Sequence, residues 1–320
     1  MGSCSGTVLV ADPPSPRPTR ERCSVVGRTF PLFASLAATV LVATVLAVAA
    51  TQDPAEAAFP GKNGRIAFAL FPGVGDAEIH TMRPDGSGPR PVTDNSAHDV
   101  RPAWSPDGTK LSFTRHEKIF VKDMRNGRVV RLTDNAGMSS FDSAWSPSGA
   151  RIAFDSNRDG DQEIYAMDSS DGGRVEKLTD NRNHDVNPAW SPDGTRIAFE
   201  RDYDIWVMNA DGTGQENLTD TTDSASEYEP DWSPDGTRIA FTRDGDIWVM
   251  DADGADQKNL TNTASFGEDY PAWSPDGTRI AFTERDDIWV MDADGTDQKN
   301  LTNTPRVTEY MGDWQPITAP

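Results

Sequence analysis

From residue 59 to its end, the chain alternates short runs of apolar and polar residues with tight turns. In one representative unit, residues 279–283 alternate apolar and polar side chains and residues 288–291 are apolar, so each run predicts a β-strand. A short strand ending at Trp273 precedes them, and a more polar strand over residues 299–302 follows. The turns S-P-D-G and D-A-D-G join the strands, because proline presets φ and glycine accepts a positive φ. Without any helical period, the unit predicts four strands and an all-β fold.

This unit recurs along the chain. Six tryptophans stand 41, 45, 42, 41 and 41 residues apart, five of them in a W-S-P phrase and the last in a truncated D-W-Q-P. They are Trp104, Trp145, Trp190, Trp232, Trp273 and Trp314. A period of about 40–45 residues made of short strands is typical of a β-propeller with one blade per repeat. Residues 232–263 and 273–304 agree at 28 of 32 positions, which indicates a recent duplication.

The repeats predict six blades. Five are complete, and a weaker first repeat begins at Phe59, where phenylalanine replaces the tryptophan. No further strands follow Trp314, so we expect its strand to become the innermost strand of the first blade, beside residues 65–93. Both ends of the chain would then share one blade and leave no open sheet edge. The predicted domain is a six-bladed propeller of four-stranded antiparallel blades over residues 58–320.

Residues 1–57 differ in kind from the repeats. Arginines, an uncharged stretch over residues 29–52 and the sequence Ala55-Glu56-Ala57 together predict a signal peptide cleaved after Ala57, with a disordered basic and proline-rich start. The uncharged stretch is also long enough to cross a bilayer, so an uncleaved anchor over residues 30–50 is the alternative. Either interpretation places the propeller outside the cytoplasm, as an extracellular, periplasmic or cell-envelope protein.

Charge and cysteine content narrow the partners. The formal net charge is −21, and because acidic and basic residues balance in residues 1–57, the propeller carries all of it. An acidic surface repels nucleic acid phosphates and anionic lipids, so we expect no nucleic acid partner and membrane contact only through an uncleaved N-terminal segment. A basic protein or peptide suits this charge. Cys4 and Cys23 both precede the propeller, which therefore has no disulfide and no thiolate metal site.

Loops of antiparallel blades alternate between two faces. The S-P-D-G and D-A-D-G turns share one face. The links that enter the first strand of each unit, and those between its second and third strands, share the other, which we call the mouth face. Loops on this face are longer and differ between repeats, as binding loops on a rigid scaffold do.

The links that enter the first strands are acidic. Five of six have a carboxylate five residues before the tryptophan, and the other has Asp142 three residues before it, with aromatic residues interleaved. This pattern predicts an acidic funnel at the mouth of the central channel that binds a protein or peptide; a solvated rim whose carboxylates cap turns is the alternative. The candidate binding residues are Asp99, Asp142, Asp185, Glu227, Tyr228, Glu229, Glu268, Asp269, Tyr270, Glu309 and Tyr310.

We expect no catalytic residue, no cofactor and a monomer. The acidic turns over residues 251–256 and 292–297 resemble calcium loops but lack their full ligand spacing. Residues 157–163 form another acidic loop, and calcium is only a weak alternative at all three. The competing function is a propeller enzyme, such as a metal-dependent hydrolase or lyase acting at the channel mouth. Its ligands would come from Asp99, Asp185, His98, His184 and Glu268. Near-identical blades contribute near-identical residues here, whereas an active site breaks internal symmetry.

The phrase P-x-W-S-P-D-G-T-x-I-A-F, followed by D-I-W-V-M-x-x-D-G and L-T, resembles the WD40-like (PD40) propeller repeat of the TolB family over residues 59–320. The resemblance implies a six-bladed propeller outside the cytoplasm that binds a partner at its channel mouth, as TolB binds the lipoprotein Pal. TolB also has an N-terminal α/β domain that we do not expect here, so the resemblance does not imply membership of a Tol–Pal complex. The repeat also occurs beside prolyl oligopeptidase-type hydrolase domains, but their G-x-S-x-G motif is absent from this sequence.

Overall fold

The computed structural model describes residues 61–318, apart from 74, 135–136, 221–224, 264–266 and 305–306. The chain divides into two units, Met1–Ala50 and Thr51–Pro320, and every described residue lies in the second. The expected leader, its cleavage site and Phe59 therefore lie outside the described residues. Among the described residues there is no helix that could cross a membrane.

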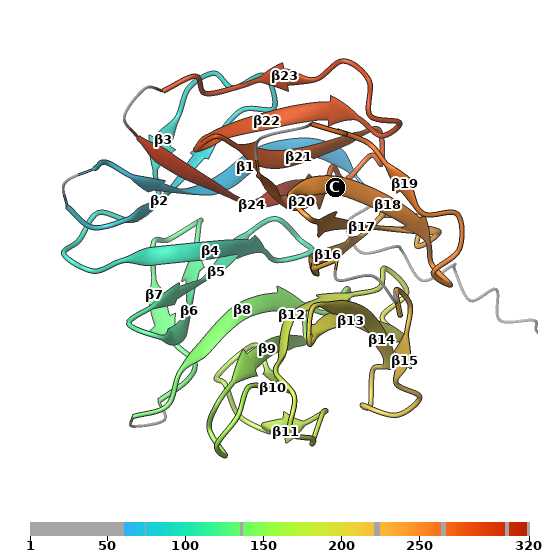
Figure 1. The fold of residues 1–320 in the computed structure, drawn as a ribbon. Coiled ribbons are helices and arrows are strands. Elements are labelled where there is room, and N and C mark those ends of the chain that lie inside the picture. The colour runs from blue at the N-terminus through green and yellow to red at the C-terminus, as the bar shows by residue number, and fades with distance from the viewer. Residues whose placement is uncertain are drawn as a thin grey trace, which may run out of the picture. The chain divides into compact units, whose positions relative to one another are not determined.

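The described residues form 24 strands in six four-stranded antiparallel sheets, arranged as blades around a central axis (Figure 1). This confirms the all-β six-bladed propeller. Blade 1 holds β24 (Thr308–Ile317), β1 (Lys62–Phe71), β2 (Glu78–Met82) and β3 (Arg90–Pro91). Blade 2 holds β4 (Asp99–Trp104), β5 (Lys110–Arg115), β6 (Lys118–Asp123) and β7 (Val129–Arg131). Blade 3 holds β8 (Ser140–Trp145), β9 (Arg151–Ser156), β10 (Glu163–Asp168) and β11 (Glu176–Lys177). Blade 4 holds β12 (Asp185–Trp190), β13 (Arg196–Arg201), β14 (Asp204–Asn209) and β15 (Glu216–Asn217). Blade 5 holds β16 (Glu227–Trp232), β17 (Arg238–Arg243), β18 (Asp246–Asp251) and β19 (Lys258–Asn259). Blade 6 holds β20 (Glu268–Trp273), β21 (Arg279–Glu284), β22 (Asp287–Asp292) and β23 (Lys299–Asn300).

The hydrophobic core lies between blades. Trp273 of blade 6 packs in one buried cluster with Ile280 and Phe282 of its own blade and with Ile247 and Val249 of blade 5. The other tryptophans of the repeat have the same place in the other clusters. Each repeat thus buries its apolar face only against a neighbour, so the ring must be complete to be stable.

The C-terminal strand closes the ring as predicted. β24 pairs with β1, and Trp314 stands opposite Ile66 as Trp104 stands opposite Leu111 in blade 2. Figure 1 shows the red β24 beside the blue β1. Trp314 is therefore the tryptophan of blade 1, and the innermost strands contact one another in a closed cycle.

The innermost strands of blades 2–6 each carry a β-bulge. In each of these strands, the pairing register with the second strand changes between the fourth and the first residue before the tryptophan, for example between Val100 and Ala103. The third residue before the tryptophan has a positive φ in all five: Arg101 56°, Asp142 47°, Asn187 54°, Glu229 58° and Tyr270 58°. Residues other than glycine rarely adopt this conformation, and a bulge changes the direction of a side chain. The bulges turn these five side chains toward the central channel.

Candidate binding site in the central channel

The innermost strands of all six blades line a central cavity of about 180 Å³. Each of these strands starts at the mouth face and ends at an S-P-D-G-type turn, so residues earlier in the strand lie nearer the mouth. We call the six residues three positions before the tryptophans the channel ring. They are Arg101, Asp142, Asn187, Glu229, Tyr270 and Met311. Four prolines form much of the next layer, and alanines with Asp231 and Asp313 form the layer below.

Polar contacts hold the channel ring in place. The Arg101 guanidinium pairs with the Asp142 carboxylate, which raises the pKa of Arg101. The Asn187 side-chain amide donates to Oε2 of Glu200, which lies on β13, the second strand of the same blade, at 2.8 Å. Oε2 of Glu229 accepts from the backbone N–H of Tyr270 at 2.7 Å. Two of these three contacts join neighbouring blades, so the ring is preorganised by the fold rather than by a ligand.

Burial raises the pKa of several carboxyl groups in and beside the ring. Burial raises the pKa of Glu229 to about 8, against the opposing effect of the Tyr270 N–H. Burial also raises the pKa of Glu200 to about 7. Asp155 of β9 has a pKa well above its usual range, because it is buried and faces Asp142. Uncompensated burial disfavours the charged form of a carboxyl group.

The two acids in the lower layer connect blades. Oδ2 of Asp231 accepts from the N–H of Trp273 at 2.7 Å, and Oδ2 of Asp313 accepts from the N–H of Trp104 at 2.7 Å. Burial raises their pKa values to about 8 and about 7. These contacts explain why two repeats read D-W where the others read A-W.

The structure corrects the expected position of five candidate residues. The carboxylates five positions before the tryptophans are 0–1% exposed and do not form an open rim. They are Asp99, Asp185, Glu227, Glu268 and Glu309. The reason is a backbone hydrogen bond that recurs in each blade: the N–H of this position donates to the mouth-face link of the preceding blade, as from Glu227 to the carbonyl of Tyr203 at 2.7 Å. This bond draws the residue between two blades.

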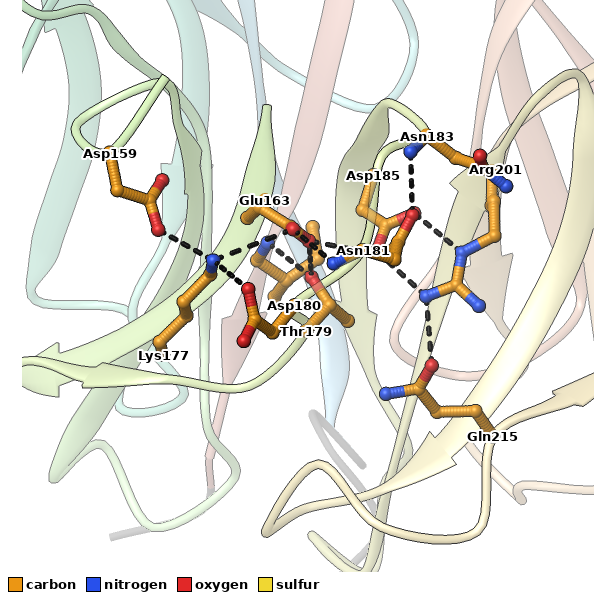
Figure 2. Close-up of polar contacts among 11 residues, drawn as sticks. Asp159, Glu163, Lys177, Thr179, Asp180, Asn181, Asn183, Asp185, Arg201 and Gln215 are labelled. Carbon is orange, nitrogen blue, oxygen red and sulfur yellow. Dashed lines mark hydrogen bonds and ion pairs between the residues drawn. The ribbon is translucent and has the colours of Figure 1, made fainter. Parts of the chain in front are cut away.

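Most of these buried carboxylates have partners within the fold. Asp185 accepts two hydrogen bonds from Arg201, at 2.6 and 2.7 Å, and a third from Asn181 at 2.8 Å (Figure 2). Asp99 pairs with Arg115 at 2.6 Å, and Glu227 with Arg243 at 3.3 Å. A buried charge is tolerated when it is paired and hydrogen-bonded in this way. Each arginine lies opposite its carboxylate on the second strand of the same blade, so these pairs hold the first and second strands of one blade together.

Blade 6 departs from this pattern. Glu268 stands opposite Glu284 in the strand register, where blades 2, 4 and 5 have arginine. Glu268 instead accepts hydrogen bonds from Thr261 and Thr263. Burial, with the nearby carboxylates of Asp246 and Glu284, raises the pKa of Glu268 to about 7.

Aromatic residues gather at the mouth. The Tyr310 ring lies edge-on to Tyr270 at 5.8 Å and to Phe71 at 5.4 Å between centroids. The Tyr228 hydroxyl donates to Oδ1 of Asp269 at 3.3 Å. Of the predicted residues, the structure thus places Asp142, Glu229 and Tyr270 in the channel ring, and Tyr228, Asp269 and Tyr310 one position nearer the mouth.

Sequence reasoning missed the rest of the ring and one exposed tyrosine. Tyr203 is 63% exposed and has a φ of 69° in the two-residue turn between β13 and β14. Blade 5 has Gly245 at the equivalent position, as a type I′ turn prefers. For the ring, the available signal was variation, because the third position before the tryptophan differs in all six blades.

The residues considered for metal binding have other contacts. Nδ1 of His98 accepts from the N–H of Ala77 at 3.0 Å, and Nε2 lies 3.4 Å from Asp76. Asp99 and Asp185 are the buried arginine partners described above. Within the described part of the propeller, no three histidine, cysteine, aspartate or glutamate residues are grouped to hold a metal ion.

The fold and the channel define a closed six-bladed β-propeller whose central cavity has a mostly polar ring of side chains on its mouth side. Within this class, residues 63–204 match the family described as TolB beta propeller domain (PD40), so the chain carries a TolB-like propeller. "Tol-Pal system protein TolB" of Desulfosudis oleivorans is 35% identical over 121 residues, 36% of this chain and 26% of that protein. "Uncharacterized peptidase YuxL" of Bacillus subtilis is 33% identical over 90 residues, 25% of this chain and 13% of that protein. The chain thus spans about a quarter or less of these curated relatives.

Solved structures agree on the fold. TolB from Acinetobacter baumannii superposes with a TM-score of 0.69 at 25% identity, covering 81% of this chain and 68% of that one. An oligogalacturonate lyase in complex with manganese has a TM-score of 0.55 at 13% identity, covering 72% of each chain, and shows the shared fold alone.

Proposed function

We propose that this protein is an exported, non-catalytic propeller that binds a protein partner through its mouth face, at the channel ring and the aromatic residues around it. The observation that carries the proposal is the contrast within the repeats. Blades built on the same repeat each present a different ring side chain, and bulges turn five of the six into the channel. Variation at a position that faces a cavity suits binding rather than structure. The relatives named TolB, one of them a Tol-Pal system protein, support export and a protein partner.

Tyr203 is a second observation that favours binding at the mouth face. A positive φ in a bulky residue costs roughly 1 kcal/mol or more and persists where something maintains it. Tyr203 is also the most exposed of the large hydrophobic residues described. Tyrosine is enriched among the residues that dominate protein interfaces. Tyr203, with its strained backbone and exposed side chain, is therefore suited to act as an anchor for the partner.

The enzyme alternative loses three of its five expected ligands. Asp99 and Asp185 are occupied by Arg115 and Arg201, and His98 by a loop contact. The raised pKa of Glu229 alone assigns no reaction, because buried structural acids show the same shift.

Crosslinking in the producing cells would test the proposal. The tagged full-length protein is crosslinked, and its partners are identified by mass spectrometry and then measured with purified protein. Tyr203→Gly combined with Tyr310→Ala should weaken the identified complex about tenfold or more, since interface tyrosines are frequent hot spots. The matched control is Val175→Ala, which changes a 42% exposed apolar residue on the opposite face. Equal affinity of the mouth-face variant and the control would refute the proposal.

A further inference from the structure

Carboxyl groups outnumber cations in the upper channel. Asp142 is matched by Arg101, the cationic group that the surrounding carboxyl groups face. Glu200 and Glu229 add two more carboxyl groups, both under the influence of this ion pair. The titratable groups that influence one another here lie on β4, β8, β9, β13, β16 and β20. They are Arg101, Asp142, Asp155, Glu200, Glu229, Asp269 and Tyr270.

Asp155 provides an independent sign that a donor is missing. Its side chain is 1% exposed, and Oδ2 accepts from Gln162 at 3.0 Å. Oδ1 is buried and accepts no hydrogen bond from a described donor; the side chain instead faces the Asp142 carboxyl group, and Arg101 is the cation that acts on it. Buried polar atoms nearly always have a partner, and an unsatisfied one is costly. The deficit in this part of the channel is one of hydrogen-bond donors and positive charge.

The geometry of Glu229 fits the same deficit. The hydrogen bonds that it accepts from described residues, from Tyr270 at 2.7 Å and Thr242 at 3.4 Å, both end on Oε2. Glu229 and Tyr270 both line the cavity. An aromatic face beside a carboxylate is a favourable environment for a cation on an alkyl stem.

We propose that the upper channel binds the ammonium or guanidinium group of a lysine or arginine side chain presented by the partner, with Glu229 as its principal carboxylate. This inference rests on the proposed function and names the chemistry that the mouth face recognises. The alkyl stem passes Tyr270 and Tyr310, and the cationic group supplies the donors and charge that the channel lacks. Because Glu229 and Glu200 hold protons near neutral pH, the cation displaces protons from them into solvent, and binding strengthens as pH rises.

Calorimetry with short peptides would test this. The probes are acetylated, amidated Gly-Gly-Lys-Gly-Gly and Gly-Gly-Arg-Gly-Gly, with a Gln peptide as the neutral reference, titrated into the full-length protein. Repeating the titration in buffers of different ionisation enthalpy measures proton release. With a Glu229 pKa of about 8 that falls below 6 on binding, affinity should drop about 50-fold from pH 8 to pH 6.

Glu229→Gln is the informative variant, because the amide oxygen can still accept from Tyr270. It should weaken cation binding at pH 8 at least about tenfold and remove most of the pH dependence. Asp297→Asn makes an equal charge change at an exposed site on the opposite face, and it should change neither the affinity for the cation nor its pH dependence. Thermal melts confirm that both variants fold.

The outcomes separate the inference from the proposed function. Lysine and arginine peptides that bind no better than the glutamine peptide at about 10 mM, or that bind equally at pH 6 and pH 8, overturn the inference. The proposed function would survive that result if partner affinity still depends on Tyr203 and Tyr310. If cation binding releases protons but mouth-face variants keep full partner affinity, the cation site in the channel stands, whereas its use for a protein partner and the proposed function both fail.

Discussion

Replacing Glu284 with arginine should stabilise the propeller at pH 8 and change its stability little at pH 5. Blades 5 and 6 are near duplicates, yet blade 5 pairs Glu227 with Arg243 where blade 6 sets Glu268 against Glu284. Blade 5 therefore shows how an arginine fits at this position. There, Arg243 is 14% exposed and lies 4.9 Å from the centre of the Trp248 ring.

The magnitude follows from Glu268. Its pKa rises from an ordinary 4.5 to about 7 in the folded protein, first because of burial and then because of Asp246 and Glu284. One pKa unit corresponds to about 1.4 kcal/mol, so the shift represents about 3 kcal/mol. Because the folded pKa lies above the unfolded one, this stability is present below pH 4.5 and is lost as pH rises through 7. Arginine at position 284 removes the repulsion and stabilises the ionised Glu268, so most of that loss should disappear.

Urea unfolding followed by tryptophan fluorescence at pH 5 and pH 8 would measure the effect. We expect Glu284→Arg to gain about 2–3 kcal/mol at pH 8 and less than about 1 kcal/mol at pH 5. Thr296→Ala is the matched control, because it also makes blade 6 more like blade 5 but lies in an exposed turn on the opposite face. A gain of equal size at both pH values would refute the linkage argument, and destabilisation at pH 8 would show that Glu284 has a favourable role in the fold.

Two further predictions concern stability. Tyr203→Gly should stabilise the fold by about 1 kcal/mol, because glycine adopts the φ of 69° without strain, and an unchanged or lower urea midpoint would contradict this. Trp314→Ala should destabilise the fold by about 3–5 kcal/mol, because the side chain is 1% exposed and its Nε1 donates to Ala272 across the blade junction. Ile317→Ala at the exposed end of the same strand is its control and should stay within about 0.5 kcal/mol, and equal effects of the two would argue against closure by β24.

The architecture could be predicted from the sequence because it depends on spacing. The tryptophan period, the apolar second and third strands and the glycine turns each repeat, so counting them yields six blades. Trp314 without following strands predicted the closure, since an open ring would expose a sheet edge. Local and repeat-level signals agreed at every blade, which is why a single sequence was sufficient.

The position of the candidate site depends on the register of the innermost strands, and the acidic pattern five residues before the tryptophans predicted that position wrongly. Strict alternation puts the fifth, third and first residues before a tryptophan on one side of the strand. The bulge interrupts this alternation, so Asp185 is buried between blades while Asn187 and Ala189 line the channel. One extra residue in a strand redirects every side chain on one side of it. In blades 2, 4 and 5, the acidic residue at the fifth position was therefore a signal of buried pairing with an arginine on the second strand of the same blade, such as Arg201.

A comparison of the duplicated blades 5 and 6 shows where their sequence differences are unfavourable for stability. Blades 5 and 6 differ at four of 32 positions between their first tryptophan and last threonine, and three of the four are consecutive, at residues 243–245 and 284–286 in the mouth-face link. Two of these changes are unfavourable for the fold: glutamate replaces the arginine that pairs with a buried carboxylate, and Asp286 replaces a glycine at a φ of 66°. The single difference outside this link lies on the opposite face and carries no such cost. Divergence that concentrates on one face and lowers stability there is expected of a binding surface, since sites of function retain local strain that a purely structural link would lose.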